Sequence, residues 1–214
     1  MDSARLEVIC KMLRPSPLTA DVGCDHGYVA KEVLKSGKAE KVIISDISAK
    51  CLAKAESLLE DEIADGRAIS VVSNGFEKLP KCDLALIAGM GGEEIISILK
   101  NAWYLPQTLV FQPMKNLPKL RVFLVELGYK IIKDYVFTAE QKYYDLLLVE
   151  KGEDKLSDDE IEFGRTNLLE KGKAYLERLS KEINSLYFYA KQDGLSLENQ
   201  RRFIEKAERL SKYV

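Results

Sequence analysis

Two segments that contain aspartate and glycine are spaced as a nucleoside-binding site requires. Residues 21–27 (DVGCDHG) follow a short apolar run, and glycines 23 and 27 let the backbone turn tightly beside a ligand. The helix expected after this loop offers its N-terminal amides to an anion. Asp46 ends the next apolar run, 23 residues after Gly23, where a carboxylate accepts both ribose hydroxyls. Together these residues predict a ligand with a nucleoside and an anionic group, although Asp46 alone is equally a helix cap.

Two further glycine-containing turns follow later apolar runs. Asn74 or the backbone of Gly75 is placed to hydrogen-bond an adenine, and Phe76 to pack against its face. Residues 89–92 (GMGG) put three glycines around one methionine, which is more than a turn requires. This pattern indicates backbone that lies close to a ligand or a flat base. The alternative interpretation of both segments is a purely structural turn.

The loop at residues 21–27 argues against a dinucleotide ligand. A pyrophosphate-binding turn has the pattern G-x-G-x-x-G, and Asp25 stands where its second glycine would be. His26, the only histidine, is either a structural residue or a functional one of this loop. One histidine and widely spaced thiols predict no metal site and no disulfide; the cysteines are Cys10, Cys24, Cys51 and Cys82.

Short apolar runs alternate with helical stretches in the first 130 or so residues, which predicts a parallel sheet covered by helices on both faces. Two more strands have no helix between them and predict an antiparallel hairpin at the end of the sheet. A seven-stranded sheet of this kind is typical of the Rossmann-like class I methyltransferases. The predicted strands are 18–22, 42–45, 69–72, 83–88, 109–112, 131–137 and 144–150, and the predicted helices are 2–13, 27–36, 48–64, 93–101 and 116–127.

The last third of the chain has a different pattern. An acidic linker, residues 153–162, precedes a long helix and a shorter one that begins near Leu197, with Gly194 between them. Apolar residues at alternating spacings of three and four predict an antiparallel coiled-coil hairpin. We therefore expect two domains, residues 1–152 and 153–214. The predicted seam consists of Leu169, Gly172, Leu176, Leu179, Ile183, Leu186 and Ala190, and then Phe203, Ala207, Leu210 and Val214.

The composition is that of an ordinary globular protein, with 46% hydrophobic and 31% charged residues in 214. No apolar run approaches the roughly 20 residues of a membrane span, and the N-terminal residues do not resemble a signal peptide. We therefore expect a cytoplasmic protein that does not bind membranes. The net charge of −2 argues against a nucleic-acid surface that covers the whole protein, but not against a local basic face.

One such basic face is predicted at the end of the chain. Residues 171–214 contain ten Lys or Arg and six Asp or Glu. The hairpin is therefore a candidate for phosphate contacts, and its alternatives are a solvated charged surface or a dimer interface. Monomer and dimer both stay open. The candidates for phosphate contact are Lys171, Lys173, Arg178, Lys181, Arg201, Arg202, Lys206 and Arg209, and a second basic cluster consists of Lys31, Lys35, Lys38 and Lys41.

Several segments together resemble the bacterial tRNA (adenine22-N1)-methyltransferase family. They are DVGCDHGYVAKEVLKSG, VIISDIS, SNGF, AGMGG, QPMKNLPKLRVFL and KYYDLLLVE. The resemblance spans roughly residues 3–150 and continues more loosely into the helical tail. It implies a Rossmann-like catalytic domain, a C-terminal coiled-coil domain, S-adenosyl-L-methionine as cofactor and tRNA as partner. The implied reaction transfers a methyl group to N1 of an adenine in the D-loop region.

The resemblance also implies roles for individual positions. Asn74 stands where the family often has Asp, which keeps an acceptor oxygen but loses the charge. The implied catalytic residues are Asp25, Met90 and Gly91. The implied cofactor-binding residues are Asp21, Gly23, Asp25, His26, Gly27, Asp46, Ile47, Asn74, Gly75, Phe76 and Gly89. The candidates for substrate contact are Tyr28, Gln112, Tyr143, Lys171, Lys173, Arg178, Arg201 and Arg202.

The implied acceptor determines what the site must do. Adenine N1 already has a lone pair, so the reaction needs in-line placement of the reacting atoms rather than a strong base. The adenine must be unstacked to expose N1, and its cationic product is stabilised by a nearby carboxylate or carbonyl group. Two alternatives stay open: a methyltransferase for another RNA, a protein or a small molecule, and a non-catalytic RNA-binding protein.

Overall fold

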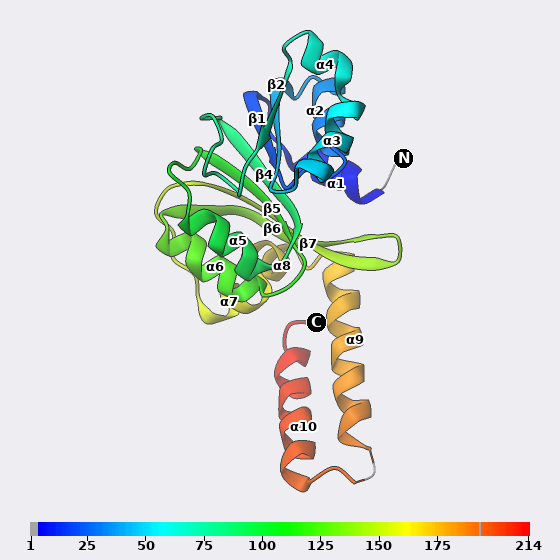
Figure 1. Ribbon diagram of the computed structural model, residues 1–214. Coiled ribbons are helices and arrows are strands. Elements are labelled where there is room, and N and C mark those ends of the chain that lie inside the picture. The colour runs from blue at the N-terminus through cyan, green and yellow to red at the C-terminus, as the bar shows by residue number, and fades with distance from the viewer. Residues whose placement is uncertain (1–3, 193) are drawn as a thin grey trace.

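The computed structural model describes residues 4–192 and 194–214, so residues 2 and 3 of the first predicted helix lie outside it. A seven-stranded sheet in the order β3-β2-β1-β4-β5-β7-β6 forms the centre of the N-terminal part (Figure 1). The pairs from β3 to β5 are parallel, and β7 pairs antiparallel with both β5 and β6. The strands are β1 (Ser16–Val22), β2 (Ala39–Asp46), β3 (Ala68–Val72), β4 (Leu84–Met90), β5 (Thr108–Pro113), β6 (Tyr129–Ala139) and β7 (Lys142–Lys151).

Helices cover both faces of this sheet because its central strands are apolar on both sides. On β2, Val42 and Ile44 point into one core with α1 and α2, whereas Ile43 points into the opposite core with α5 and α6. All three side chains are at most 1% exposed. The helices of this part are α1 (Ala4–Met12), α2 (Tyr28–Lys35), α3 (Ala49–Leu58), α4 (Glu60–Ala64), α5 (Gly92–Lys100) and α6 (Leu117–Glu126).

The terminal hairpin of the sheet confirms the predicted fold class. Strands β6 and β7 pair from Tyr129↔Lys151 to Ala139↔Lys142. Glu140 and Gln141 connect them with positive φ values of 50° and 61°, as a tight two-residue hairpin turn requires. The sequence predicted a longer connection over residues 138–142. The sheet is that of the class I methyltransferases, as the pattern indicated.

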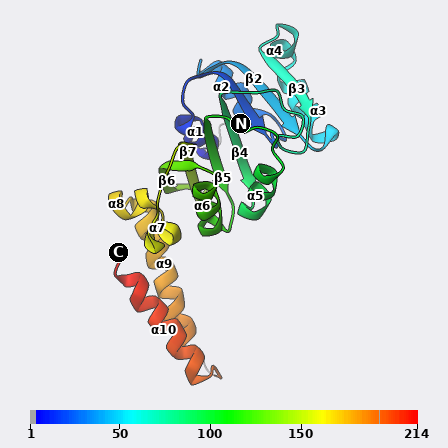
Figure 2. The same ribbon diagram turned by 90° about the vertical axis from the view of Figure 1, so that its left-hand side faces the viewer.

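The segment after the sheet is more structured than the sequence suggested. The expected linker 153–162 contains most of α7 (Asp158–Phe163), which a capping box between Ser157 and Glu160 begins, and α8 (Arg165–Glu170) follows. The hairpin consists of α9 (Lys173–Ala190) and α10 (Leu197–Ser211) and projects away from the sheet in both views (Figures 1 and 2).

Three expectations about the helices are corrected. The predicted helix 48–64 is divided at Leu59, where φ and ψ are −108° and 23°. Leu169 belongs to α8 and is 77% exposed, and Gly172 is the N-cap of α9, so neither belongs to the seam. Val214 is 51% exposed, so the second seam ends at Leu210. Within residues 4–192 and 194–214, no helix combines the length and apolar character needed to cross a bilayer.

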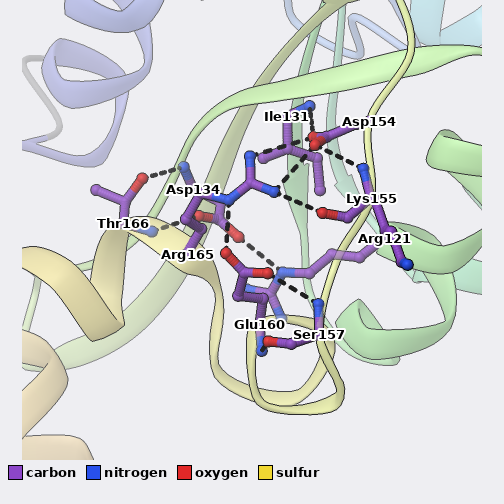
Figure 3. A network of polar contacts seen from close by, with 9 residues as sticks. All are labelled: Arg121, Ile131, Asp134, Asp154, Lys155, Ser157, Glu160, Arg165 and Thr166. Carbon is purple, nitrogen blue, oxygen red and sulfur yellow. Dashed lines mark hydrogen bonds and ion pairs between the residues drawn. The ribbon is translucent and has the colours of Figure 1, made fainter.

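A buried polar network attaches α7 and α8 to the sheet part (Figure 3). Arg121 of α6 donates to Asp134 of β6 at 2.8 Å, and both side chains are only 1% exposed. The other oxygen of Asp134 accepts the backbone amide of Thr166 at 2.9 Å. The Arg121 guanidinium also donates to the carbonyl oxygen of Ile161 at 2.9 Å. The two short helices that precede the hairpin are thereby fixed to α6 and β6.

Candidate active site

The loop between β1 and α2 has the tight backbone that its glycines predicted. Gly23 and Gly27 have φ values of 75° and 72°, and Asp25 between them has a φ of 46°. The amides of Gly23 and Cys24 donate to the carbonyl oxygen of Ser45 at 2.8 and 3.0 Å, which ties the loop to the end of β2. A Cβ atom on Gly23 would lie 2.0 Å from Cε of Met90. Any side chain at position 23 would therefore displace the end of the Met90 side chain.

Asp46 stands at the carboxyl end of β2, next to this loop. Its Oδ1 accepts the amide of Ser48 at 2.8 Å, and its Oδ2 accepts the amide of Asp25 at 3.3 Å. Each carboxylate oxygen has a further lone pair, so the group can still accept hydrogen bonds from a ribose. Ile47 follows with 70% of its surface exposed, although it is a large apolar residue. The two residues thus present a carboxylate and an apolar surface side by side.

The turn after β3 contains three residues predicted to contact an adenine, and they lie in different environments. Asn74 is exposed and donates from Nδ2 to Glu77 at 2.7 Å, which leaves its side-chain oxygen Oδ1 for an adenine amino group. Gly75 has a φ of 57°, and a Cβ there would lie 2.5 Å from Cγ2 of Ile98. Phe76 is 0% exposed and packs edge-on against Tyr104, so the structure places it in the core and not on the surface of the site.

The carboxyl end of β4 contains a β-bulge. Ala88 pairs with Gln112 and Met90 with Pro113, so Gly89 is the extra residue, with a φ of 79°. Such a bulge re-aims the strand, and Met90 beside it lines the pocket described below. Gly92 donates its amide to the carbonyl oxygen of Lys115 at 2.9 Å. The tips of β4 and β5 are thereby joined.

These four strand ends enclose a pocket of about 160 Å³. Its walls combine the Asp46 carboxylate, the side-chain oxygen of Asn74 and apolar side chains. These acceptors suit the hydroxyl and amino groups of a nucleoside. The loop around Gly23 presents backbone rather than side chains to the remaining part of a ligand. The residues therefore fit S-adenosylmethionine. The lining consists of Val22, Gly23, Asp46, Ile47, Ser73, Asn74, Gly75, Met90, Glu94, Ser97 and Ile98. The sequence did not single out the last three, on α5, because no motif marks them.

Charged and aromatic side chains surround Asp25. Its carboxylate accepts from Nδ1 of His26 at 2.6 Å and from Nζ of Lys54 at 3.1 Å. Burial opposes ionisation, but these hydrogen bonds outweigh it and hold the pKa of Asp25 below its usual range. The ring of Tyr28 stacks on His26 with centroids 5.6 Å apart and is itself 39% exposed. Asp25 is therefore ionised, with part of its charge offset by Lys54.

Asp21 lies deeper, at the end of β1, and is 6% exposed. Burial raises its pKa to about 7, a hydrogen bond from the Ala30 amide opposes this, and the charge of Asp46 adds to it. A cationic group of a ligand near this carboxyl would favour its ionised form. Asp21 is thus a buried acid that titrates near neutral pH, directly beneath the loop.

Gln112 is buried and does not present its amide to the site. Its Oε1 accepts two hydrogen bonds from Arg5 of α1, at 2.5 and 2.9 Å, and its Nε2 donates to the carbonyl of Pro113 at 3.2 Å. The Arg5 guanidinium also lies 5.2 Å from the ring centroid of Tyr144 and contacts the space next to Gly89. Arg5 is a residue of the site that sequence reasoning missed, since 107 positions separate it from Gln112.

The other candidates for substrate contact lie on or beside the helical hairpin. Tyr143 of β7 has Nζ of Lys181 at 4.8 Å from its ring centroid, and Arg178 pairs with Asp145 at 2.8 Å. Lys173 is exposed and pairs with Glu177 at 3.8 Å. Lys171 has an αL conformation at the end of α8, and Arg201 and Arg202 are exposed on α10. The structure therefore does not bring these residues into the pocket.

All four cysteines are free thiols. Among residues 4–192 and 194–214, no group of three or more histidine, cysteine or acidic side chains is placed to hold a metal ion.

Comparison with known proteins agrees with this geometry. The family model described as a methyltransferase domain matches residues 2–147. The tRNA (adenine(22)-N(1))-methyltransferase of Bacillus subtilis is 25% identical over 222 residues, which is 97% of this chain and 93% of that protein. Two Mycoplasma relatives are 34% and 30% identical, and the chain aligns with only 62% of the length of each.

Solved structures match the whole chain. TrmK of M. capricolum with S-adenosyl-homocysteine is 26% identical, with a TM-score of 0.86 and coverage of 100% of this chain and 97% of that one. A Streptococcus pneumoniae protein with S-adenosyl-L-methionine is 25% identical, with a TM-score of 0.87 and coverage of 100% and 99%. The resemblance and the fold class that the motifs predicted are thereby confirmed.

Proposed function

We propose that this chain, which belongs to the methyltransferase-domain family, is an S-adenosylmethionine-dependent tRNA methyltransferase that modifies N1 of the adenine at position 22. The observation that supports this most directly is the pocket at the ends of β1, β2, β3 and β4, where a carboxylate, an amide oxygen and apolar surface converge. The similarity to the Bacillus subtilis enzyme over nearly the whole chain supports the choice of substrate.

Different residues of the pocket contact different parts of the cofactor. Asp46 accepts the ribose hydroxyls, Ile47 packs on the adenine, and Asn74 accepts from its amino group. The loop from Gly23 to Gly27 and the first amides of α2 hold the carboxylate of the methionine part. Bound S-adenosylmethionine supplies an electrophilic methyl group.

The chain's own residues then place the acceptor. The bulge at Gly89 and the backbone of Met90 and Gly91 floor the place where adenine N1 approaches. Tyr28, with its exposed ring stacked on His26, offers a surface on which an unstacked base can lie. Asp25 is ionised and stabilises the cationic product, although the ammonium of Lys54 at 3.1 Å reduces its effect.

The C-terminal part of the chain, residues 153–214 with the helical hairpin, binds the tRNA backbone in this proposal. Lys171, Arg201 and Arg202 are exposed cations and form no ion pair within the part of the chain that the structure describes. They are therefore better candidates for phosphate contacts than Arg178, which pairs with Asp145. A tRNA substrate also implies that the protein acts in the cytoplasm.

The test is a methyl-transfer assay with labelled S-adenosylmethionine and unmodified tRNA, followed by nucleoside analysis. We expect label in 1-methyladenosine, and Asp46→Asn should weaken cofactor binding by at least about 10-fold, because a charged acceptor is lost. Asp61→Asn, an exposed carboxylate of α4, is the matched control. Cofactor binding without label in tRNA would assign another acceptor, and no cofactor binding would overturn the methyltransferase activity itself.

A further inference from the structure

A second cavity lies outside the cofactor pocket, between the N-terminal end of α6 and the helical hairpin. Its volume is about 200 Å³, below the roughly 300–1,000 Å³ of sites for drug-sized ligands. It therefore has room for a single ring system. Its walls are apolar where Phe163, Leu179 and Leu210 line it.

One polar group in these walls has no partner. Tyr175 lines the cavity and is only 5% exposed, and its hydroxyl forms no hydrogen bond with any residue that the structure describes. A buried hydroxyl without a partner costs stability, so native proteins seldom keep one without a reason. The hydroxyl is itself covered by protein atoms, so a ligand with a polar edge in the cavity supplies the missing hydrogen bond once these atoms shift.

The end of the cavity that Lys115, Asn116, Leu117 and Pro118 line, called its mouth below, favours a negative charge. Lys115 lines it and forms no ion pair among the described residues. Helix α6 begins there, its N-cap Asn116 makes no capping hydrogen bond with its side chain, and its first turn has no acidic residue. The amides of Leu117 and Lys119 in this first turn are thus available to an anion, whereas Pro118 between them has no N–H.

The acidic side chains around the cavity do not oppose this. Asp145 pairs with Arg178 at 2.8 Å, and Glu162 pairs with Arg209 at 2.7 Å. Glu182 pairs with Lys206 at 2.8 Å. Because each carboxylate has its own cation, Lys115 and the start of α6 determine the charge at the mouth.

We propose that this cavity is a nucleobase pocket, which receives a base of the substrate tRNA that is unstacked near the adenine to be methylated. The apolar walls contact the ring, the Tyr175 hydroxyl bonds its edge, and Lys115 with the first turn of α6 holds its phosphate. The inference rests on the proposed function, since it assumes a tRNA substrate.

The position of the mouth supports a base close to the target. Lys115 packs over the loop of residues 89–92, because a Cβ atom on Gly91 would lie 3.1 Å from the Cε atom of Lys115. The amide of Gly92 donates to the carbonyl oxygen of Lys115, and the amide of Met114 donates to the carbonyl oxygen of Met90 at 2.8 Å. The loop that floors the methyl-transfer site therefore continues directly into the mouth, so one strand of RNA can reach both places.

The experiment combines full-length variants with tRNAs that each lack one base near the methylated adenine. Leu179→Phe fills the cavity, and Leu176→Phe is the matched control, because Leu176 packs in the same hairpin but does not line the cavity. We expect Leu179→Phe to lower kcat/KM for complete tRNA by about 10-fold, with unchanged cofactor affinity. For wild type, kcat/KM should fall by a similar factor on one of the abasic tRNAs. For Leu179→Phe, kcat/KM on that abasic tRNA should equal its value on complete tRNA.

Tyr175→Phe gives a readout that does not depend on filling the cavity. Removing a hydroxyl without a partner should leave the melting temperature unchanged or raise it, yet lower tRNA affinity by about 3- to 10-fold. Two results would overturn the proposal. In the first, wild type methylates tRNA and both Leu179→Phe and Tyr175→Phe have the same kcat/KM and tRNA affinity as wild type. In the second, removal of a base lowers kcat/KM by the same factor for wild type and for the variants on every abasic tRNA. Absence of methylation by wild type would instead refute the proposed function.

Discussion

The side chain of Arg5, near the N-terminus of the chain, donates two hydrogen bonds to Oε1 of the buried Gln112 at the carboxyl end of β5. The same guanidinium faces the ring of Tyr144 and the bulge at Gly89. Helix α1 is thereby fixed across the strand ends that hold the loop of residues 89–92. Arg5 is thus a positioning residue, which acts through Gln112 and the backbone near Gly89.

We predict that Arg5→Lys lowers kcat/KM for tRNA by about 10-fold and leaves cofactor affinity unchanged. A lysine keeps the charge but cannot give two parallel hydrogen bonds to one amide oxygen. Kinetics with varied tRNA and calorimetry with S-adenosylmethionine check this. The control is Arg14→Lys, because Arg14 is exposed and pairs with Glu150. Unchanged kinetics of Arg5→Lys would show that Gln112 is held without it.

The sheet could be predicted because its strands are short apolar runs with clear ends. The glycine loop and Asp46 could be predicted for the same reason, since residues at the ends of neighbouring parallel strands meet in space. Arg5 could not, because its partner is 107 positions away and no local pattern connects them. Phe76 is predicted to contact the ligand because it follows Asn74 and Gly75 in sequence, but its side chain lies in the core.

The region between the sheet and the hairpin shows a second limit. The capping box of Ser157 and Glu160 was visible in the sequence and marks the start of α7, but the acidic composition suggested a linker. Leu169 fits the spacing of the seam. However, Lys171 has an αL conformation and ends α8, so Leu169 does not lie on the same helix as the rest of the seam. Spacing alone does not reveal such an interruption, because it assumes one continuous helix.

We predict that Gly164→Ala destabilises the protein by about 2 kcal/mol or more. Gly164 has a φ of 88°, and a Cβ there would lie 2.5 Å from the guanidinium of Arg121 and 2.6 Å from the carboxylate of Asp134. Both groups are fixed in a buried pair and cannot move away. Gly172→Ala, where a Cβ meets no atom within 4 Å, should cost less than about 1 kcal/mol. Urea unfolding compares the two, and equal losses would contradict a steric cause.

We predict that Arg121→Met costs about 3–5 kcal/mol, because it leaves the Asp134 carboxylate buried without its cation. The carbonyl oxygen of Ile161 loses its donor as well. Replacing Asp134 by Leu in the same variant should recover part of the loss, since the unpaired charge is then removed. Lys119→Met, on the exposed side of α6, should change stability by less than about 0.5 kcal/mol. A double variant no more stable than Arg121→Met would contradict this account.

The last prediction concerns the pH dependence that Asp21 imposes on the cofactor-free protein. Burial raises its folded-state pKa to about 7, against a usual value of 3.8. Between about pH 4 and pH 7 the folded state therefore holds a proton that the unfolded state has released, so stability falls as the pH rises. Asp21→Asn stays neutral at every pH and keeps an acceptor oxygen. The variant should gain stability over wild type progressively from pH 4 to 7, by up to about 4 kcal/mol, and then stay constant. Urea unfolding at several pH values measures this gain. Glu93→Gln, an exposed carboxylate, should show no such rise, and a gain for Asp21→Asn that is the same at pH 4 and pH 8 would show that the carboxyl is ionised throughout.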